Sequence, residues 1–369
     1  MPLPDFQLER YFARYEFNAP YLLSSSDCES QTIGNVLALE PGAAEEFQNL
    51  WLGYTESQGD PALRDEIARI YTNVEAQDIL VFSGAEEAIY VFMHAGLQSG
   101  DHVIVHYPAY QSLHEIARAQ GCDVTPWETH ADDNWELNMD FLRRHLRPET
   151  RAVIVNCPHN PTGYQMSSEK WEELLALSQE QGFRIFSDEV YRFLEYDPAK
   201  RLPAACDVAV NAVSLGVMSK AFGLPGLRIG WLATRDRALF QRLCAYKDYT
   251  TICNSAPSEF LARIALRHRD TLITRSQDII RDNLALLNPF FAARTDRFRW
   301  RPPLAGPIAF PELLREDVET FCDNVVREAG VLLLPGTVYD PHLNHFRIGF
   351  GRANFPMALA QFTEYMNSY

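Results

Sequence analysis

The sequence predicts an α/β protein: a three-layer αβα domain with a mostly parallel sheet, plus a smaller α+β domain. From about residue 60, short apolar strands alternate with amphipathic helices, which is typical of parallel sheets covered on both faces. After about Ser255 this alternation gives way to long helical periodicity and then a few strands. The 369 residues suffice for two domains.

The elements follow in chain order. The N-terminal segment as far as Phe17 predicts an amphipathic helix, and an extended arm follows it. Asp60 and Pro61 mark a helix start, with a capping carboxylate and a proline at the first helical position. Strands are expected at 79–82, 102–106, 151–156, 184–187, 208–214 and 229–233. Helices are expected at 86–97, 110–120, 168–181, 235–249, 317–329 and 356–366, with helical periodicity through 258–291.

These elements suggest three divisions of the chain. Residues 46–254 are expected to form the large domain, and residues 255–369 the small C-terminal domain. We expect residues 1–45 to form an arm that joins the small domain.

Composition excludes several classes of protein. Hydrophobic residues make up 47% and charged residues 22% of the chain, as in ordinary soluble proteins, and the net charge of −16 argues against binding nucleic acid. No apolar run approaches the ~20 residues of a membrane span, and no signal peptide is evident. Seven scattered cysteines without a CxxC pair suggest reduced thiols in the cytoplasm, and we expect no bound metal.

Lys220 is the most informative residue. In the apolar run 208–233 only Lys220 and Arg228 are charged. A buried amine has a lowered pKa and becomes a nucleophile that can form a Schiff base with an aldehyde. Taken alone, the run favours a lysine whose head reaches out to solvent, and it is the upstream motifs that reverse this interpretation.

Two upstream motifs follow predicted strands. Ser83-Gly84-Ala85-Glu86-Glu87 opens a helix, where free backbone N–H groups can bind a phosphate, although an ordinary turn would look the same. Asn156-Cys157-Pro158-His159-Asn160-Pro161-Thr162-Gly163 forms a loop at a strand's carboxyl end, where the Asn160 amide can both donate and accept a hydrogen bond.

Ser187-Asp188-Glu189-Val190-Tyr191 ends another strand. A buried Asp188 needs a cationic partner, which a protonated pyridine nitrogen would supply. Glu189 can instead pair with a nearby arginine, and Tyr191 can reach the same ligand as Asp188. Arg228 offers two parallel donors to a phosphate.

Together these groups describe a pyridoxal-phosphate pocket. The order N-P-T-G, S-D-E-V-Y and S-K-x-x-G-x-x-G-x-R-x-G-W resembles class I/II aminotransferases of the fold type I (aspartate aminotransferase-like) superfamily, from Tyr54 to Arg347. The resemblance implies that Lys220 forms the Schiff base with pyridoxal 5'-phosphate and that Asp188 keeps the pyridine nitrogen protonated.

The resemblance also implies roles for other positions. Asn160 and Tyr191 would bind the phenolic oxygen of the cofactor, and Tyr110 would stack on the ring unless it is a core tyrosine. The phosphate would be held by Gly84, Ala85, Glu86, Ser219, Arg228 and Tyr54. Tyr54 would reach across to the other subunit, so the resemblance implies a homodimer with active sites at the interface. Arg347 would bind the substrate α-carboxylate, with Arg352 as its local competitor.

The chain departs from the family pattern at two places. Val217 stands where the family has a serine or threonine that touches the phosphate, and Ser219, beside Lys220, is the residue that could compensate. Near the N-terminus the arm contains Ser24-Ser25-Ser26 where many members have glycine. Ser26 could bind a polar substrate, or the stretch could be a turn with a helix cap near Ser30.

The expected function is transfer of the α-amino group of an amino acid to a 2-oxo acid by a ping-pong mechanism, with Lys220 as the base. The alternative is a pyridoxal-phosphate-dependent β-lyase or cyclase. Serine-rich arms similar to this one occur in capreomycidine synthases, which carry out elimination and cyclisation on an arginine-derived substrate. A non-catalytic ligand-sensing domain is disfavoured, because the enzyme motifs already begin at Tyr54 and the charge is acidic.

Overall fold

The computed structural model describes residues 2–368 and centres on a seven-stranded sheet. Its order is β2-β8-β7-β6-β5-β3-β4, and every pair is parallel except those of β8 with β2 and β7. The strands are β2 (Ile79–Phe82), β3 (His102–Tyr107), β4 (Asp123–Glu128), β5 (Thr150–Asn156), β6 (Arg184–Asp188), β7 (Ala212–Val217) and β8 (Gly230–Ala233). The mostly parallel sheet confirms the predicted fold class.

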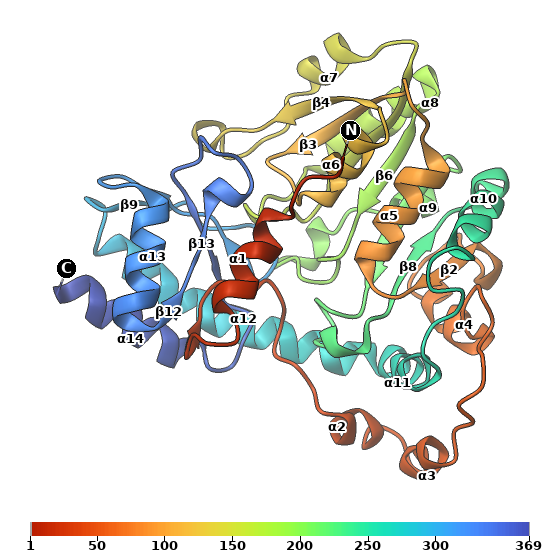
Figure 1. The fold of residues 1–369 in the computed structure, drawn as a ribbon, viewed down its shortest axis with the longest axis horizontal. Coiled ribbons are helices and arrows are strands. Elements are labelled where there is room, and N and C mark those ends of the chain that lie inside the picture. Colours follow the sequence, from red (N-terminus) through yellow and green to blue (C-terminus); the bar gives the residue numbers. More distant parts are fainter. Residues whose placement is uncertain (1, 369) are drawn as a thin grey trace.

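Helices cover both faces of this sheet, giving three layers (Figure 1). One face carries α5 (Ala85–Gly96), α6 (Ser112–Ala119) and α10 (Arg237–Lys247), which share a core with Ile154, Phe186 and Leu215. The other face carries α7 (Met139–His145), α8 (Ser168–Gln181) and α9 (Ala205–Val208). Neighbouring residues of one strand, such as Ile154 and Val155, point to opposite faces, so both sides of the strands are apolar.

The rest of the described chain forms further helices and three small sheets. The helices are α1 (Gln7–Tyr15), α2 (Ile33–Leu37), α3 (Ala43–Gln48), α4 (Pro61–Ala68), α11 (Ala256–Arg267), α12 (Arg269–Ala292), α13 (Val318–Ala329) and α14 (Phe355–Ser368). The strands are β1 (Tyr21–Leu22), β9 (Phe298–Arg299), β10 (Ile308–Ala309), β11 (Glu312–Leu313), β12 (Val331–Leu332), β13 (Leu334–Pro335) and β14 (Phe346–Gly349). Short 3₁₀ helices lie at Ala76–Asp78, Ala131–Asp133, Pro198–Lys200, Pro225–Leu227 and Gly336–Val338.

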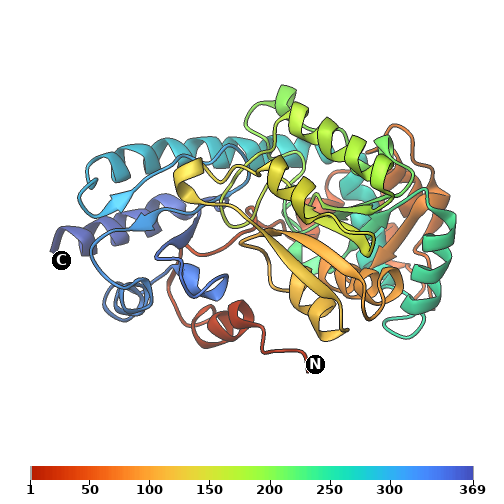
Figure 2. The same cartoon turned by 90° about the horizontal axis from the view of Figure 1, so that it is seen from above.

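The N-terminal arm is tied to the C-terminal part of the chain. Strand β1 pairs in parallel with β12, and the backbone N–H of Glu29 donates to the carbonyl of Gly351. Figure 2 shows the long helix α12 running from the side of the large sheet to the C-terminal end of the molecule. The arm therefore packs against the C-terminal part of the chain, while the division of the chain into domains stays a prediction.

Several elements differ from the sequence-based prediction, and three of these differences have a clear cause in the structure. Strand β4 was not predicted, because Asp123, Pro126 and Glu128 interrupt its apolar pattern and only pairing with β3 defines it. Strand β7 begins four residues later than 208, because α9 takes the preceding segment. The periodicity through 258–291 is divided into α11 and α12 at His268. No helix within residues 2–368 is long and apolar enough to cross a membrane.

Candidate active site

The carboxyl ends of β2, β3, β5, β6 and β7 meet at one edge of the large sheet, as expected for ligand sites of such sheets. A cavity of about 330 Å³ opens there. Its lining brings together most residues proposed from the sequence: Ser26, Ala85, Glu86, Tyr110, Asn160, Asp188, Tyr191, Ser219, Lys220, Arg228 and Arg347. Gly84 and Tyr54 are the two proposed residues outside this lining, and Tyr54 is 88% exposed at the surface.

Lys220 follows β7 and points into the cavity, where its Nζ donates a hydrogen bond to Ser26 Oγ (2.9 Å). Burial lowers the pKa of Lys220 to about 8. A substantial fraction of this amine is therefore neutral near pH 8, and the neutral form is the nucleophile and the base. The lowered pKa agrees with the prediction from the apolar run around Lys220.

Asp188 ends β6, where it lies opposite Asn156 of β5 and Leu215 of β7 in the sheet register. Its side chain is 4% exposed and accepts a hydrogen bond from the backbone N–H of Val190 (3.1 Å). Within residues 2–368 no lysine, arginine or histidine forms an ion pair with it, and burial raises the pKa of Asp188 to about 7. The site therefore presents a carboxylate that lacks a cationic partner.

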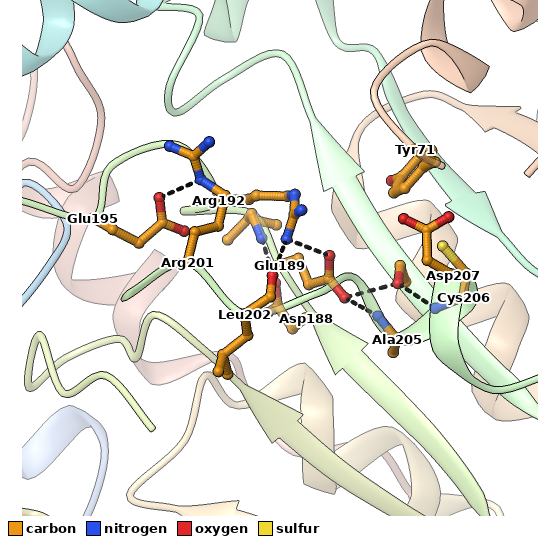
Figure 3. A network of polar contacts seen from close by, with 12 residues as sticks. Tyr71, Asp188, Glu189, Arg192, Glu195, Arg201, Leu202, Ala205, Cys206 and Asp207 are labelled. Atoms are coloured by element: carbon orange, nitrogen blue, oxygen red, sulfur yellow. Dashed lines mark hydrogen bonds and ion pairs between the residues drawn. The ribbon is translucent and has the colours of Figure 1, made fainter. Parts of the chain in front are cut away.

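Glu189, the next residue, is not part of the cavity lining and belongs to a buried polar network (Figure 3). Its Oε1 accepts hydrogen bonds from the backbone N–H of Ala205 (2.9 Å) and from Ser214 Oγ (2.7 Å). Its Oε2 lies 3.7 Å from Arg192 Nη1. The arginine pairing proposed for Glu189 is thus present, and this buried network fixes the strand end that carries Asp188.

Asn160 lines the cavity and is held by hydrogen bonds through both its side chain and its backbone. Its Oδ1 accepts from the Tyr339 hydroxyl (3.0 Å) and from Arg347 Nη1 (3.2 Å). Its backbone N–H donates to Asn156 Oδ1 (2.7 Å), which fixes the loop. Because Oδ1 is occupied twice, the amide nitrogen is the part of Asn160 left to bind a ligand oxygen.

Arg347 and Arg352 differ in their partners. Arg347 is 1% exposed, and it donates to Ser24 O, Asn160 Oδ1 and Tyr339 Oη, all of which are uncharged. Arg352 instead forms two hydrogen bonds to the carboxylate of Asp27 (3.1 and 2.9 Å). Arg347 therefore keeps an unneutralised buried charge at the cavity, which favours it over Arg352 as the anchor for a ligand carboxylate.

Glycines at the turn after β2 and in the neighbouring strand β8 allow close approach of the backbone and of Arg228. Gly84 has a φ of +91°, and a Cβ at Gly84 would lie 2.6 Å from Arg228 Nη2. A Cβ at Gly230 would lie 2.7 Å from the carbonyl carbon of Gly84. The turn leads into the N-terminus of α5 at Ala85, and Arg228 brings its guanidinium beside it. The Gly84 N–H itself donates to Phe82 O (2.9 Å), so the N–H groups of the first turn of α5, together with the Arg228 cation, are the donors that suit a phosphate.

One sequence-based expectation needs adjustment at the site. The Tyr191 hydroxyl, whose pKa is raised by burial, donates to the carbonyl of Ser26 (3.1 Å), so its single proton is already used. Val217 and Ser219 both line the cavity, so the departure at Val217 lies within the site.

The sequence did not point to several cavity residues. They are Leu8, Glu9 and Phe12 of α1, Glu16 directly after α1, Asp27, and Asn156. The amphipathic pattern of α1 predicts a helix but not the surface on which it packs, and no local signal could have placed it over the cavity. Within residues 2–368 no group of three or more His, Cys, Asp or Glu side chains is placed to hold a metal ion.

Comparison with known proteins decides the family. The sequence profile of aminotransferase class I and II matches residues 21–360. The chain belongs to this family. Its cofactor is pyridoxal 5'-phosphate, and the site fits that group: Asp188 lacks a cation, Lys220 is a buried amine, and the Gly84 turn with Arg228 suits a phosphate.

Three known proteins are similar to this chain over its whole length. Capreomycidine synthase from Streptomyces vinaceus is 32% identical, covering 100% of this chain and 94% of the relative. The solved structure of a PLP-dependent aminotransferase from Streptococcus suis 89-1591 is 30% identical with a TM-score of 0.94, covering 100% of this chain and 99% of that one. The PLP-dependent cyclase OrfR is 30% identical with a TM-score of 0.91, covering 100% and 98%.

Proposed function

We propose that the protein is an aminotransferase that moves the α-amino group of an amino acid to a 2-oxo acid. The observation that carries this proposal is the placement of Lys220, Asp188 and Arg347 around one cavity. Arg347 supplies a buried charge for the α-carboxylate, and Lys220 supplies an amine with a pKa of about 8. The similarity to the Streptococcus suis aminotransferase over the whole chain supports it.

We propose that the cofactor is held by five groups of the chain. Lys220 would bind its aldehyde carbon, Asp188 its ring nitrogen, the Asn160 amide nitrogen its phenolic oxygen, and the Gly84–Ala85 turn with Arg228 its phosphate. When bound, pyridoxal phosphate supplies an aldehyde that captures the substrate amine and a protonated ring that withdraws electrons from Cα.

The chain's own residues then orient the substrate and move its proton. Arg347 fixes the α-carboxylate, which limits the positions open to Cα. Lys220, with its amine neutral, would act as the base that removes the proton from Cα. Asp188 keeps its charge when its ring partner is protonated, because a cation beside a buried carboxylate lowers the carboxylate's pKa.

The test is absorbance spectroscopy of the purified, cofactor-loaded protein with single amino acids. A transaminase should convert its visible band to a near-ultraviolet band with one or a few amino acids and release the matching 2-oxo acid. A 2-oxo acid acceptor should restore the visible band, and initial rates should follow ping-pong kinetics. Release of ammonia with no need for an acceptor would contradict transamination.

The second candidate is a pyridoxal-phosphate-dependent β-lyase or cyclase. The similarity of the whole chain to capreomycidine synthase and to the cyclase OrfR favours it. Both candidates need Lys220, Asp188 and Arg347 in the same places, so the cofactor site does not separate them. Mass spectrometry of the products does: a cyclised or shortened amino acid, formed without a 2-oxo acid, would select this candidate.

We further propose that the amino donor carries a positively charged side chain. Glu9 of α1, Glu16 directly after α1 and Glu86 of α5 line the cavity, and within residues 2–368 none of them forms an ion pair. Burial raises the pKa of Glu16 and raises that of Glu86 to about 7. A cationic side chain would neutralise these carboxylates, so basic amino acids should react faster than acidic or aliphatic ones.

We propose that the protein is a cytoplasmic homodimer in which both subunits contribute to each active site. Five exposed side chains lie on two segments and form an apolar patch: Trp51, Leu52, Tyr54, Tyr249 and Ile252. Buried Lys247 joins these segments, since its Nζ donates to Ser57 O (2.8 Å) and Ile252 O (2.9 Å). Figure 1 shows the preceding helices α2 and α3 extending from the body of the molecule. A patch of this kind is typical of a subunit interface.

The apolar patch also borders the proposed phosphate site. Glu87 accepts hydrogen bonds from the backbone N–H of Thr251 (3.2 Å) and, through its other oxygen, from that of Ser83 (2.5 Å). A second copy seated on the patch would therefore approach the turn that carries Gly84. This supports the proposal that Tyr54 of one subunit completes the phosphate site of the other.

A further inference from the structure

The serine-rich arm is held rigidly across the cavity. Its start is fixed by β1, which pairs with β12, and its end by the two hydrogen bonds between Asp27 and Arg352. Between these anchors the Tyr191 hydroxyl donates to the carbonyl of Ser26 (3.1 Å). Ser26 is therefore fixed by three parts of the chain that are far apart in the sequence.

The Ser26 hydroxyl faces the amine of Lys220. Lys220 Nζ donates to Ser26 Oγ at 2.9 Å, although the two residues are 194 positions apart. Within residues 2–368 this hydroxyl is the one hydrogen-bond acceptor recorded for Nζ. The amine also lies 5.5 Å from the centre of the Tyr191 ring, which closes one side of it.

We propose that Ser26 is a positioning residue for Lys220. Its hydroxyl holds the amine on the arm's side of the cavity whenever Lys220 is not joined to the cofactor, and so keeps the base directed at the substrate. This inference rests on the proposed role of Lys220. It assigns to Ser26 a contact with the base, in place of the contact with the substrate that the sequence suggested.

The surroundings of Lys220 show why this contact has a measurable effect. Burial lowers the pKa of the amine, and so does the charge of Arg347, whereas Asp27, Cys28 and Asp188 raise it. The Ser26 hydroxyl is uncharged, but as an acceptor it stabilises the ammonium form of a buried amine. Its removal should therefore lower the pKa of Lys220 further.

The experiment measures the pKa of Lys220 in the full chain without cofactor. The protein is labelled at pH 6–10 with a trace of an acylating reagent, and mass spectrometry quantifies each lysine. The chain has only four lysines (Lys170, Lys200, Lys220 and Lys247), so the surface residue Lys200 serves as an internal reference.

In Ser26→Ala the midpoint for Lys220 should fall by about 1. Ser26→Cys, which keeps the volume and has a weak acceptor, should lower the Lys220 midpoint as well. Ser26→Thr, which keeps the hydroxyl, should leave the midpoint at the wild-type value. Ser24→Ala is the matched control, because the buried Ser24 hydroxyl has no hydrogen-bond partner and the Ser24 carbonyl is unchanged. An unchanged midpoint in both Ser26→Ala and Ser26→Cys would overturn the inference.

A second readout uses the cofactor-loaded enzyme. Ser26→Ala should lower kcat about tenfold, change KM less than twofold, and increase the isotope effect of a Cα-deuterated donor, because the base is less well placed. A rise in KM with kcat unchanged would instead return Ser26 to substrate binding. Turnover by Lys220→Ala would instead contradict the proposed function itself. This result does not depend on the behaviour of the Ser26 variants.

Discussion

The amine of Lys220 and the carboxyl of Asp188 face the same cavity from the ends of neighbouring strands, and burial moves their pKa values toward each other, to about 8 and about 7. Each group is less stable in its charged form there than in water. The charged forms of these two groups therefore destabilise the folded chain when no cofactor is bound. A bound cofactor would reduce this cost, since the ring nitrogen would give Asp188 a cation and Schiff-base formation would remove the ammonium charge.

The first prediction concerns stability without cofactor. The pKa of Asp188 is higher in the folded chain than in the unfolded one, so folding binds a proton between about pH 4 and pH 7. The unfavourable contribution is absent below about pH 4 and complete above about pH 7. Asp188→Asn should therefore be more stable than the wild type at pH 8, by on the order of 2–4 kcal/mol. The difference should shrink toward pH 4.5.

Denaturant unfolding of the two proteins at pH 4.5 and pH 8 checks this prediction. Saturating pyridoxal phosphate should stabilise the wild type more than the variant and so reduce the gap. Equal stability of both cofactor-free proteins at pH 8 would show that the Asp188 carboxyl is not strained in the folded chain.

The second prediction concerns Asp188 in the loaded enzyme. Asp188→Ala should still bind pyridoxal phosphate, because Lys220 and the phosphate site are unchanged. It should lower the rate of the first half-reaction about 10²–10³-fold, since the charge that keeps the ring protonated is lost. Stopped-flow absorbance measures this rate. Full activity of Asp188→Ala would remove Asp188 from that role.

The third prediction separates Arg347 from Arg352. Arg347→Ala should raise KM for the amino donor about 100-fold, because a buried charge-assisted pair with the α-carboxylate is lost. Arg347→Lys should recover part of this loss, since a lysine keeps the charge but not the two parallel donors. Arg352→Lys should have a smaller effect on KM, because Arg352 is committed to Asp27. Steady-state kinetics with amines that lack the carboxylate provide the control, as their KM should not respond to Arg347→Ala.

The fourth prediction concerns the dimer. The wild type should sediment at twice the mass of one chain, and Trp51→Glu should shift it toward the monomer, because a charge would be buried at the apolar patch. Mixing inactive Tyr54→Ala with inactive Lys220→Ala should restore about a quarter of the activity, since half the dimers are hybrids with one complete site. No recovery after subunit exchange would exclude a shared site.

Local patterns were sufficient for the frame of the fold. Strand β2 and helix α8 have the predicted bounds, since their apolar periodicity and capping residues lie within the segment. The motifs at the strand ends converge on one cavity because parallel strands of one sheet end at one edge. Strand β4 escaped prediction, since its polar sequence becomes a strand only through pairing with β3.

Contacts between distant segments were beyond the sequence. The pairing of Asp27 with Arg352 distinguishes the two arginines, and the hydrogen bond from Lys220 to Ser26 gives the serine-rich arm a partner. Neither contact has a local sequence signal, because the residues that it joins are 325 positions apart in one case and 194 in the other. Helix α1 illustrates the same limit: its pattern predicts a helix, but not that Phe12 and Glu16 line the cavity.

The most direct measurement is to load the protein with pyridoxal phosphate, reduce it with borohydride, and locate the pyridoxyl group by peptide mass spectrometry. With only four lysines in the chain, the assignment is unambiguous. The group should be found on Lys220 in the wild type, and the visible band should be absent from Lys220→Ala. Labelling of Lys247 or a surface lysine in place of Lys220, or an unchanged spectrum in Lys220→Ala, would contradict Lys220 as the residue that binds the cofactor.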